Sequence, residues 1–127
     1  MEIVVLDSSV LIDHLRGVPE ATAVIDGAPD QGLRPGASLV TKVEILRGTR
    51  LGERRAVREL FGLIEWLPVD DPIAGLAGEY GRIYRASHHG IEVPDLIIAA
   101  TAMRADAQLW TRNVKHFPMF DGLEAPY

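Results

Sequence analysis

The run from Ile3 to Leu6 is wholly apolar, and three of its four residues are β-branched. A short run of this kind predicts a strand buried on both faces, which is typical of a parallel sheet covered by helices. Asp7, Ser8 and Ser9 come next, and these residue types begin helices. The start of the chain therefore predicts a strand, a tight turn and a helix that ends near Gly17.

The rest of the chain repeats this alternation. The stretch 28–36 holds two prolines and two glycines and is expected to be a loop. The alternation predicts an α/β fold with a mostly parallel sheet of four to five strands, in a single domain over residues 1–127. We expect helices over about 19–28, 42–50, 53–65, 72–89 and 94–105, and strands over 37–40, 66–69, 108–111 and 122–125, with Pro68 near a sheet edge or a strand end.

Composition excludes several classes of protein. The chain has no cysteine, so disulfides, zinc–thiolate sites and cysteine nucleophiles are excluded. It has no apolar run near the roughly 20 residues that span a bilayer, and Glu2 stands where a signal peptide would be basic. We expect a cytoplasmic protein with no membrane contact. The net charge of −5 argues against binding nucleic acid over the whole surface, yet a metal site must itself be built from carboxylates.

Four oxygen-bearing side chains are expected near strand-to-helix corners. Asp7 directly follows the first strand, and Glu44 lies in the first turn of the helix after the second. Asp95 begins the helix before the fourth strand, and Asn113 follows that strand. In parallel sheets ligands bind beyond the carboxyl ends of the strands. Such a cluster would suit Mg²⁺ or Mn²⁺, which prefer oxygen ligands.

Each of these residues also has a structural interpretation. Asp7 could cap the first helix. Thr41 and Glu44 fit the Ser/Thr-x-x-Glu capping box. Asp95 could complement a helix dipole, and Asn113 is a common loop residue.

Basic and imidazole side chains form two further groups. Arg47, Arg50, Arg54, Arg55 and Arg58 would lie on two adjoining helices, either as a solvated face or as a surface for RNA phosphates or an acidic partner. His88 and His89, before Gly90, are expected to be exposed at a helix end rather than to act as ligands. No phosphate-binding glycine loop or serine-nucleophile motif occurs.

Four segments resemble the motifs of PIN-domain ribonucleases of the VapC family, in order and spacing: VVLDSSVLIDHLRG, TKVEILRG, PDLIIAATAM and LWTRNVKHF. The resemblance covers essentially the whole chain and implies a PIN-like three-layer α/β/α fold. It makes Asp7, Glu44 and Asp95 the acidic core, with Asp7 and Asp95 as metal ligands. The fourth acidic position of many relatives is Asn113 here, a neutral side chain that cannot help to neutralise a second cation. Thr111, Ser8 and Ser9 would support the site.

The resemblance implies the toxin of a type II toxin–antitoxin system: a Mg²⁺-dependent endoribonuclease that cleaves RNA with a metal-activated water, with Mn²⁺ as an alternative ion. It also implies a homodimer that is inhibited by a VapB-like antitoxin. Lys42, Arg47, Arg112 and Lys115 would contact RNA. Two other classes stay open at this point: a catalytically silent PIN-like binding module, and an acidic-pocket receiver domain.

Overall fold

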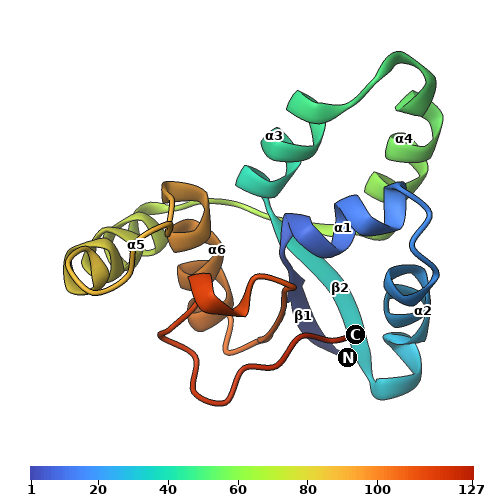
Figure 1. Ribbon diagram of the computed structural model, residues 1–127. Helices are drawn as coiled ribbons and strands as arrows, with labels where there is room; N and C mark the ends of the chain where they lie inside the picture. The colour runs from blue at the N-terminus through green and yellow to red at the C-terminus, as the bar shows by residue number, and fades with distance from the viewer.

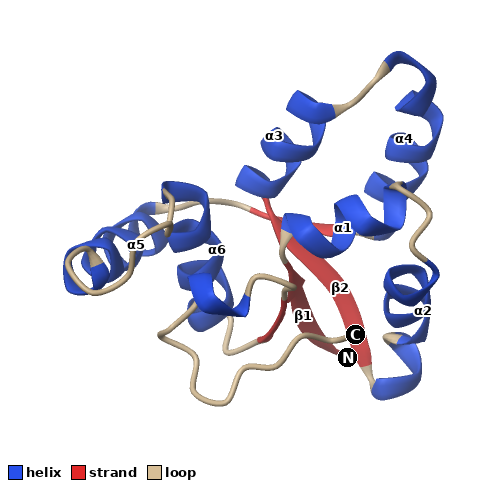
Figure 2. Cartoon of the chain, in the orientation of Figure 1, coloured by secondary structure: helices blue, strands red, loops and turns tan.

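A computed structural model describes residues 1–127, and its centre is a four-stranded sheet in which every strand pair is parallel (Figures 1 and 2). The strand order is β3-β2-β1-β4, so β1 is an inner strand. The helices and strands are β1 (Glu2–Leu6), α1 (Ser8–Leu15), α2 (Pro19–Gly27), β2 (Leu33–Ser38), α3 (Leu39–Gly48), α4 (Arg54–Leu63), β3 (Glu65–Leu67), α5 (Asp71–Tyr84), α6 (Val93–Arg104) and β4 (Gln108–Trp110).

The sheet carries helices on both faces, as the three-layer α/β/α expectation requires. Alternate side chains of β1 enter different cores because neighbouring residues of a strand point to opposite faces. Leu6 packs with side chains of α1 to α4, whereas Val5 packs with α6 and with Phe117. Helix α5 lies outside α6, where Ile73 and Ala77 contact Ala100. Val4, Val5 and Leu6 have no exposed surface, which confirms a strand buried on both faces.

The second strand differs most from expectation. We expected a loop over 28–36 and a strand over 37–40, but β2 begins at Leu33 and α3 begins at Leu39. The chain turns earlier, at Gly32, whose φ of 73° favours glycine. Pro35 and Gly36 then pair with Val4 and Val5 of β1. The prolines and glycines of this stretch therefore predicted a loop where the structure has an inner strand of the sheet.

Two other expectations need correction. No fifth strand forms at 122–125, because the chain turns at Gly122, with φ of 68°, and continues without regular structure. The helix expected over 72–89 ends at Tyr84. The other boundaries agree within a few residues, and β3, which ends just before Pro68, is an edge strand as expected. None of the helices is both long and apolar enough to cross a membrane.

Gly36 marks a close approach within the sheet, and its replacement by alanine should destabilise the fold. A Cβ there would lie 2.5 Å from Ile3 Cδ1 and 3.2 Å from the Glu65 carbonyl oxygen. Overpacking of this kind costs about 1–3 kcal/mol in the free energy of unfolding. Gly62→Ala is the matched control, since a Cβ in that helical position meets nothing within 4 Å. Urea unfolding should show Gly36→Ala less stable and Gly62→Ala as stable as wild type or more so. Equal stability of the two variants would contradict this account of β2.

Candidate active site

Asp7 is a buried carboxylate at the carboxyl end of the inner strand β1. Its side chain is 2% exposed, and its backbone N–H donates to the Trp110 carbonyl of β4 at 2.9 Å. The Thr111 hydroxyl donates to Asp7 Oδ2 at 2.7 Å, and the Ser9 hydroxyl donates to the same oxygen at 2.9 Å. Although Asp7 occupies the cap position of α1, its side chain makes no capping hydrogen bond. The helix-cap interpretation of this side chain is therefore wrong.

The two hydroxyls that hold Asp7 are themselves fixed by the backbone after β4. The Arg112 N–H donates to Ser9 Oγ at 3.0 Å, and the Asn113 N–H donates to Thr111 Oγ1 at 3.0 Å. Both interactions orient a hydroxyl so that its proton points to the carboxylate. Ser9 and Thr111 thus lie where supporting residues were expected.

Glu44 lies on α3, in the second turn rather than the first. The Ser38 hydroxyl accepts from the Val40 N–H at 3.1 Å, so Ser38 caps this helix and the proposed Thr41–Glu44 capping box does not form. Glu44 Oε1 is buried and has no hydrogen-bond partner. Burial raises the pKa of Glu44 above its usual value, and the negative charges of Asp7 and Asp95 raise it further, while the Ser8 hydroxyl acts in the opposite direction.

Asp95 lies in the first turn of α6 with a side chain that is 15% exposed. Its Oδ2 accepts the Glu92 N–H at 3.0 Å and lies 3.2 Å from His116 Nδ1. Burial raises the pKa of Asp95; the Glu92 N–H and His116 lower it, and the charge of Asp7 raises it. Asp95 therefore stabilises the start of α6, as the structural interpretation of this residue predicted. The charge of Asp7 also raises the pKa of Asp95, and the charge of Asp95 raises the pKa of Glu44.

Asp7, Glu44 and Asp95 are called the acidic cluster below. The remaining predicted site residues differ in their exposure and in the contacts that they make. Asn113 is exposed, and its side chain makes no hydrogen bond. Lys42 Nζ lies 4.7 Å from the Trp66 ring centroid, and the Arg112 guanidinium lies 4.7 Å from that of Tyr127. Both charges are thus stacked on aromatic rings of the same chain. Arg47 and Lys115 are exposed and form no ion pair.

Two residues near the cluster were not singled out from the sequence. His116 contacts Asp95 although 21 positions separate them in the chain. Its only signal was its place in the LWTRNVKHF segment. Glu92 precedes α6, and its negative charge raises the pKa of both Glu44 and Asp95. Its signal was its position immediately before the Val-Pro-Asp helix start.

The three carboxylates fit a divalent cation in their chemistry. The hydrogen bonds to Asp7 and to Asp95 all fall on Oδ2, and Glu44 Oε1 has none, so each side chain keeps one oxygen that no donor of the chain uses. Buried acids that repel one another are stabilised by a cation between them. No three His, Asp or Glu side chains stand close enough to enclose an ion. Mg²⁺ suits such an open arrangement, because it commonly keeps several waters and takes one or two carboxylates.

Known proteins match this chain both in sequence and in structure. The PIN domain family matches residues 4–121. Ribonuclease VapC19 of Mycobacterium tuberculosis is 41% identical over 122 residues, 96% of this chain and 98% of its own. Ribonuclease VapC10 of the same species is 44% identical over 125 residues, 98% of this chain and 92% of its own. A toxin–antitoxin complex from Klebsiella pneumoniae contains a chain with a TM-score of 0.82 and 26% identity, and the match covers 98% of both chains.

The parallel sheet and the acids at the ends of its strands thus define a PIN-domain protein. The chain belongs to the VapC ribonuclease family of PIN domains. The resemblance found in the four sequence motifs is confirmed by these matches over nearly the full chain.

Replacing Glu44 by glutamine should stabilise the metal-free protein at neutral pH. Because the pKa of Glu44 is higher in the folded state, its cost to folding is absent below the unfolded-state pKa and is complete once the pH exceeds the folded-state value. Glu44→Gln removes this charge, so its melting temperature in EDTA should exceed that of wild type at pH 7 but not at pH 3.

Addition of Mg²⁺ provides the control for this prediction. The ion should raise the melting temperature of wild type more than that of Glu44→Gln. A ligand stabilises a folded protein more when it binds more tightly, and wild type keeps the Glu44 carboxylate. Equal shifts in the two proteins would exclude Glu44 from the ion site.

Proposed function

We propose that this chain is the toxin of a type II toxin–antitoxin pair and cleaves RNA as a divalent-metal-dependent endoribonuclease. One observation carries the proposal: the negative charges of Asp7, directly after β1, and of Asp95, on α6, raise the pKa of Glu44 on α3, and each of the three side chains keeps an oxygen that no donor of the chain uses. Relatives named as ribonucleases, at 41% and 44% identity over nearly the whole chain, support the reaction.

Asp7, Asp95 and Glu44 are the residues that would hold the ion, which we take to be Mg²⁺, with Mn²⁺ as the alternative. When bound, the cation would make a water molecule more acidic and would offset charge on the scissile phosphate. Ser9 and Thr111 occupy Oδ2 of Asp7 and leave Oδ1 available. The Glu92 N–H donates to Oδ2 of Asp95, which also lies 3.2 Å from His116 Nδ1, so Oδ1 of Asp95 is likewise available. These donors keep the two carboxylates in fixed orientations, so little reorganisation is needed when RNA arrives.

The partner we propose is a VapB-like antitoxin bound in a groove of about 310 Å³ between α1, α3 and α4. Ile12, Leu15, Ile45 and Val57 form the apolar part of the groove lining, and its charged part is formed by Arg16, Glu44, Arg50 and Glu53. An apolar segment lying here could direct an arginine toward the acids and form charge-assisted hydrogen bonds with them. The toxin–antitoxin complex from Klebsiella pneumoniae and the structure of VapBC-1 from nontypeable Haemophilus influenzae support this partner. A homodimer is part of the same proposal.

The proposed function predicts that Asp7→Asn and Asp95→Asn abolish metal-dependent RNA cleavage while the protein stays folded. Both changes remove a charge needed to hold the cation and keep the shape of the side chain. We expect a loss of about 100-fold or more, the scale typical for removal of a group that stabilises developing charge. Cleavage of a labelled RNA with Mg²⁺, and its arrest by EDTA, would measure this. If purified wild-type protein cleaves no RNA under any divalent ion, a silent binding module becomes the better description.

Asn113→Ala should have a smaller effect than either aspartate variant. The Asn113 side chain is exposed, carries no charge and makes no hydrogen bond within the chain. Its backbone N–H, which fixes Thr111, is retained in the variant. The same cleavage assay, run as a Mg²⁺ titration, should show a decrease in rate below tenfold, since a neutral amide contributes less to cation binding than a carboxylate does. A loss as large as that of Asp95→Asn would give Asn113 a direct role in the site.

A further inference from the structure

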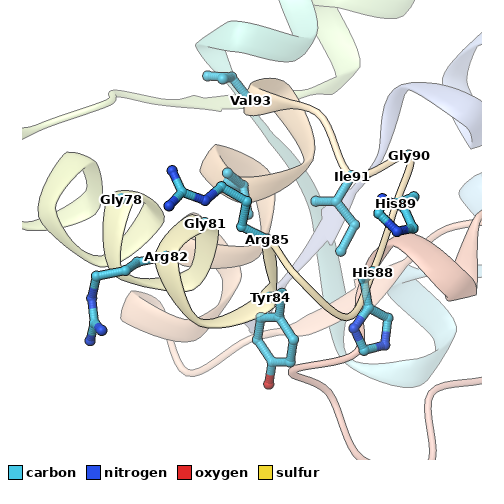
Figure 3. A pocket seen from close by; sticks show the side chains of 11 residues that line it. Gly78, Gly81, Arg82, Tyr84, Arg85, His88, His89, Gly90, Ile91 and Val93 are labelled. Atoms are coloured by element: carbon cyan, nitrogen blue, oxygen red, sulfur yellow. The ribbon is translucent and has the colours of Figure 1, made fainter.

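A second cavity, of about 530 Å³, lies between α5 and the segment that joins it to α6 (Figure 3). Its charged and titratable lining residues are Arg82, Arg85, His88, His89 and Tyr84, and no aspartate or glutamate lines it. The cavity lining thus carries only basic and neutral side chains, although the chain as a whole has a net charge of −5. A recess with such a lining favours an anionic ligand.

Arg85 carries the free positive charge of this basic cavity. It caps the end of α5, is exposed and forms no ion pair. Arg82, by contrast, is paired with Glu79. Tyr84 and His88 meet edge to face with ring centroids 5.4 Å apart, which gives the cavity an aromatic wall beside its charge. Proteins that bind single-stranded nucleic acid use aromatic rings to stack on the bases and arginines to bind the phosphates.

The basic cavity adjoins the acidic cluster through one imidazole ring. A Cβ at Gly90, in the cavity wall, would lie 3.8 Å from His116 Nε2, while Nδ1 of the same ring lies 3.2 Å from Asp95 Oδ2. Val93 of the wall and Asp95 of the cluster share the first turn of α6. The two sites are therefore neighbours across His116.

We propose that the basic cavity is a binding subsite for a nucleotide of single-stranded RNA that flanks the phosphate held at the acidic cluster. The inference rests on the proposed ribonuclease function. Arg85 binds the phosphate of this flanking nucleotide, and the Tyr84–His88 wall contacts its base. A volume of about 530 Å³ lies in the range of small-ligand pockets and accommodates a nucleotide. The subsite supplies the attraction for RNA that a cluster of acids cannot supply by itself.

A charge reversal tests the role of Arg85. The affinity of a fluorescent single-stranded RNA is measured in EDTA, which prevents cleavage, for wild type, Arg85→Glu and Arg104→Glu. Arg104 is the matched control: it is exposed and lies at the other end of α6, about 14 Å along the helix from Asp95. We expect Arg85→Glu to weaken binding about tenfold or more. The slope of log K against log salt should fall by about 0.7 for each lost phosphate contact. Arg104→Glu should stay within about twofold.

A steric pair of variants tests the cavity without changing charge. Gly78 lines the cavity and Gly75, one turn earlier on α5, does not; a Cβ at either position meets nothing within 4 Å. Gly78→Gln should weaken RNA binding because its side chain occupies the cavity, and Gly75→Gln should not. Both variants should fold, because both positions are open.

The outcomes separate this inference from the proposed function. Equal RNA affinities for Arg85→Glu and Arg104→Glu would overturn the subsite, even if wild type cleaves RNA with Mg²⁺. Light scattering gives a second check. If Arg85→Glu differs from wild type in its molecular mass in solution, the cavity is a contact between copies of the chain and the subsite is overturned. A third outcome is that Arg85→Glu and Gly78→Gln weaken RNA binding as expected, but wild type cleaves no RNA. The cavity would then remain an RNA-binding site, and the ribonuclease proposal would be wrong.

Discussion

The buried carboxylate of Asp7 is the constraint around which the rest of the structure is arranged. A carboxylate with 2% exposure costs free energy unless donors or cations compensate it. The fold supplies two hydroxyl donors, Ser9 from the start of α1 and Thr111 from the end of β4, and pairs them on one oxygen. Thr111 can reach Asp7 only because β1 and β4 are adjacent parallel strands. Repulsion among the negative charges of Asp7, Glu44 and Asp95 is not compensated by these donors, and the proposed cation site rests on this repulsion.

Much of this arrangement could be predicted from the sequence because it follows from topology. A doubly buried strand implies a parallel sheet, and parallel strands bring residues such as Asp7 and Thr111 to one edge. The strand around Pro35 and Gly36 could not be predicted, because tertiary pairing with β1 overrides a local composition typical of loops. The contact of His116 with Asp95 also depends on how the last segment folds back, which no local pattern specifies.

The charges of the molecule are divided in a way that suits a nuclease with an acidic surface overall. The negative charges of Asp7, Glu44 and Asp95 act on one another, and a recess whose lining has no acid lies next to Asp95 across His116. Several basic side chains that appeared free in the sequence, such as Lys42 and Arg112, instead stack on aromatic rings. Arg47 and Lys115 stay exposed without an ion pair, while the net charge of −5 opposes binding of nucleic acid over the surface as a whole.

The central claim, that the acidic cluster is a cation site, is tested most directly by crystals of the protein grown or soaked with Mn²⁺. Anomalous scattering locates this ion without reference to activity, and Mn²⁺ shares the oxygen-ligand preference of Mg²⁺. The account predicts an anomalous peak bonded to Asp7 and Asp95 through the oxygens that carry no hydrogen bond, with Glu44 on the same ion directly or through water. A peak elsewhere, or none at millimolar Mn²⁺, would contradict it.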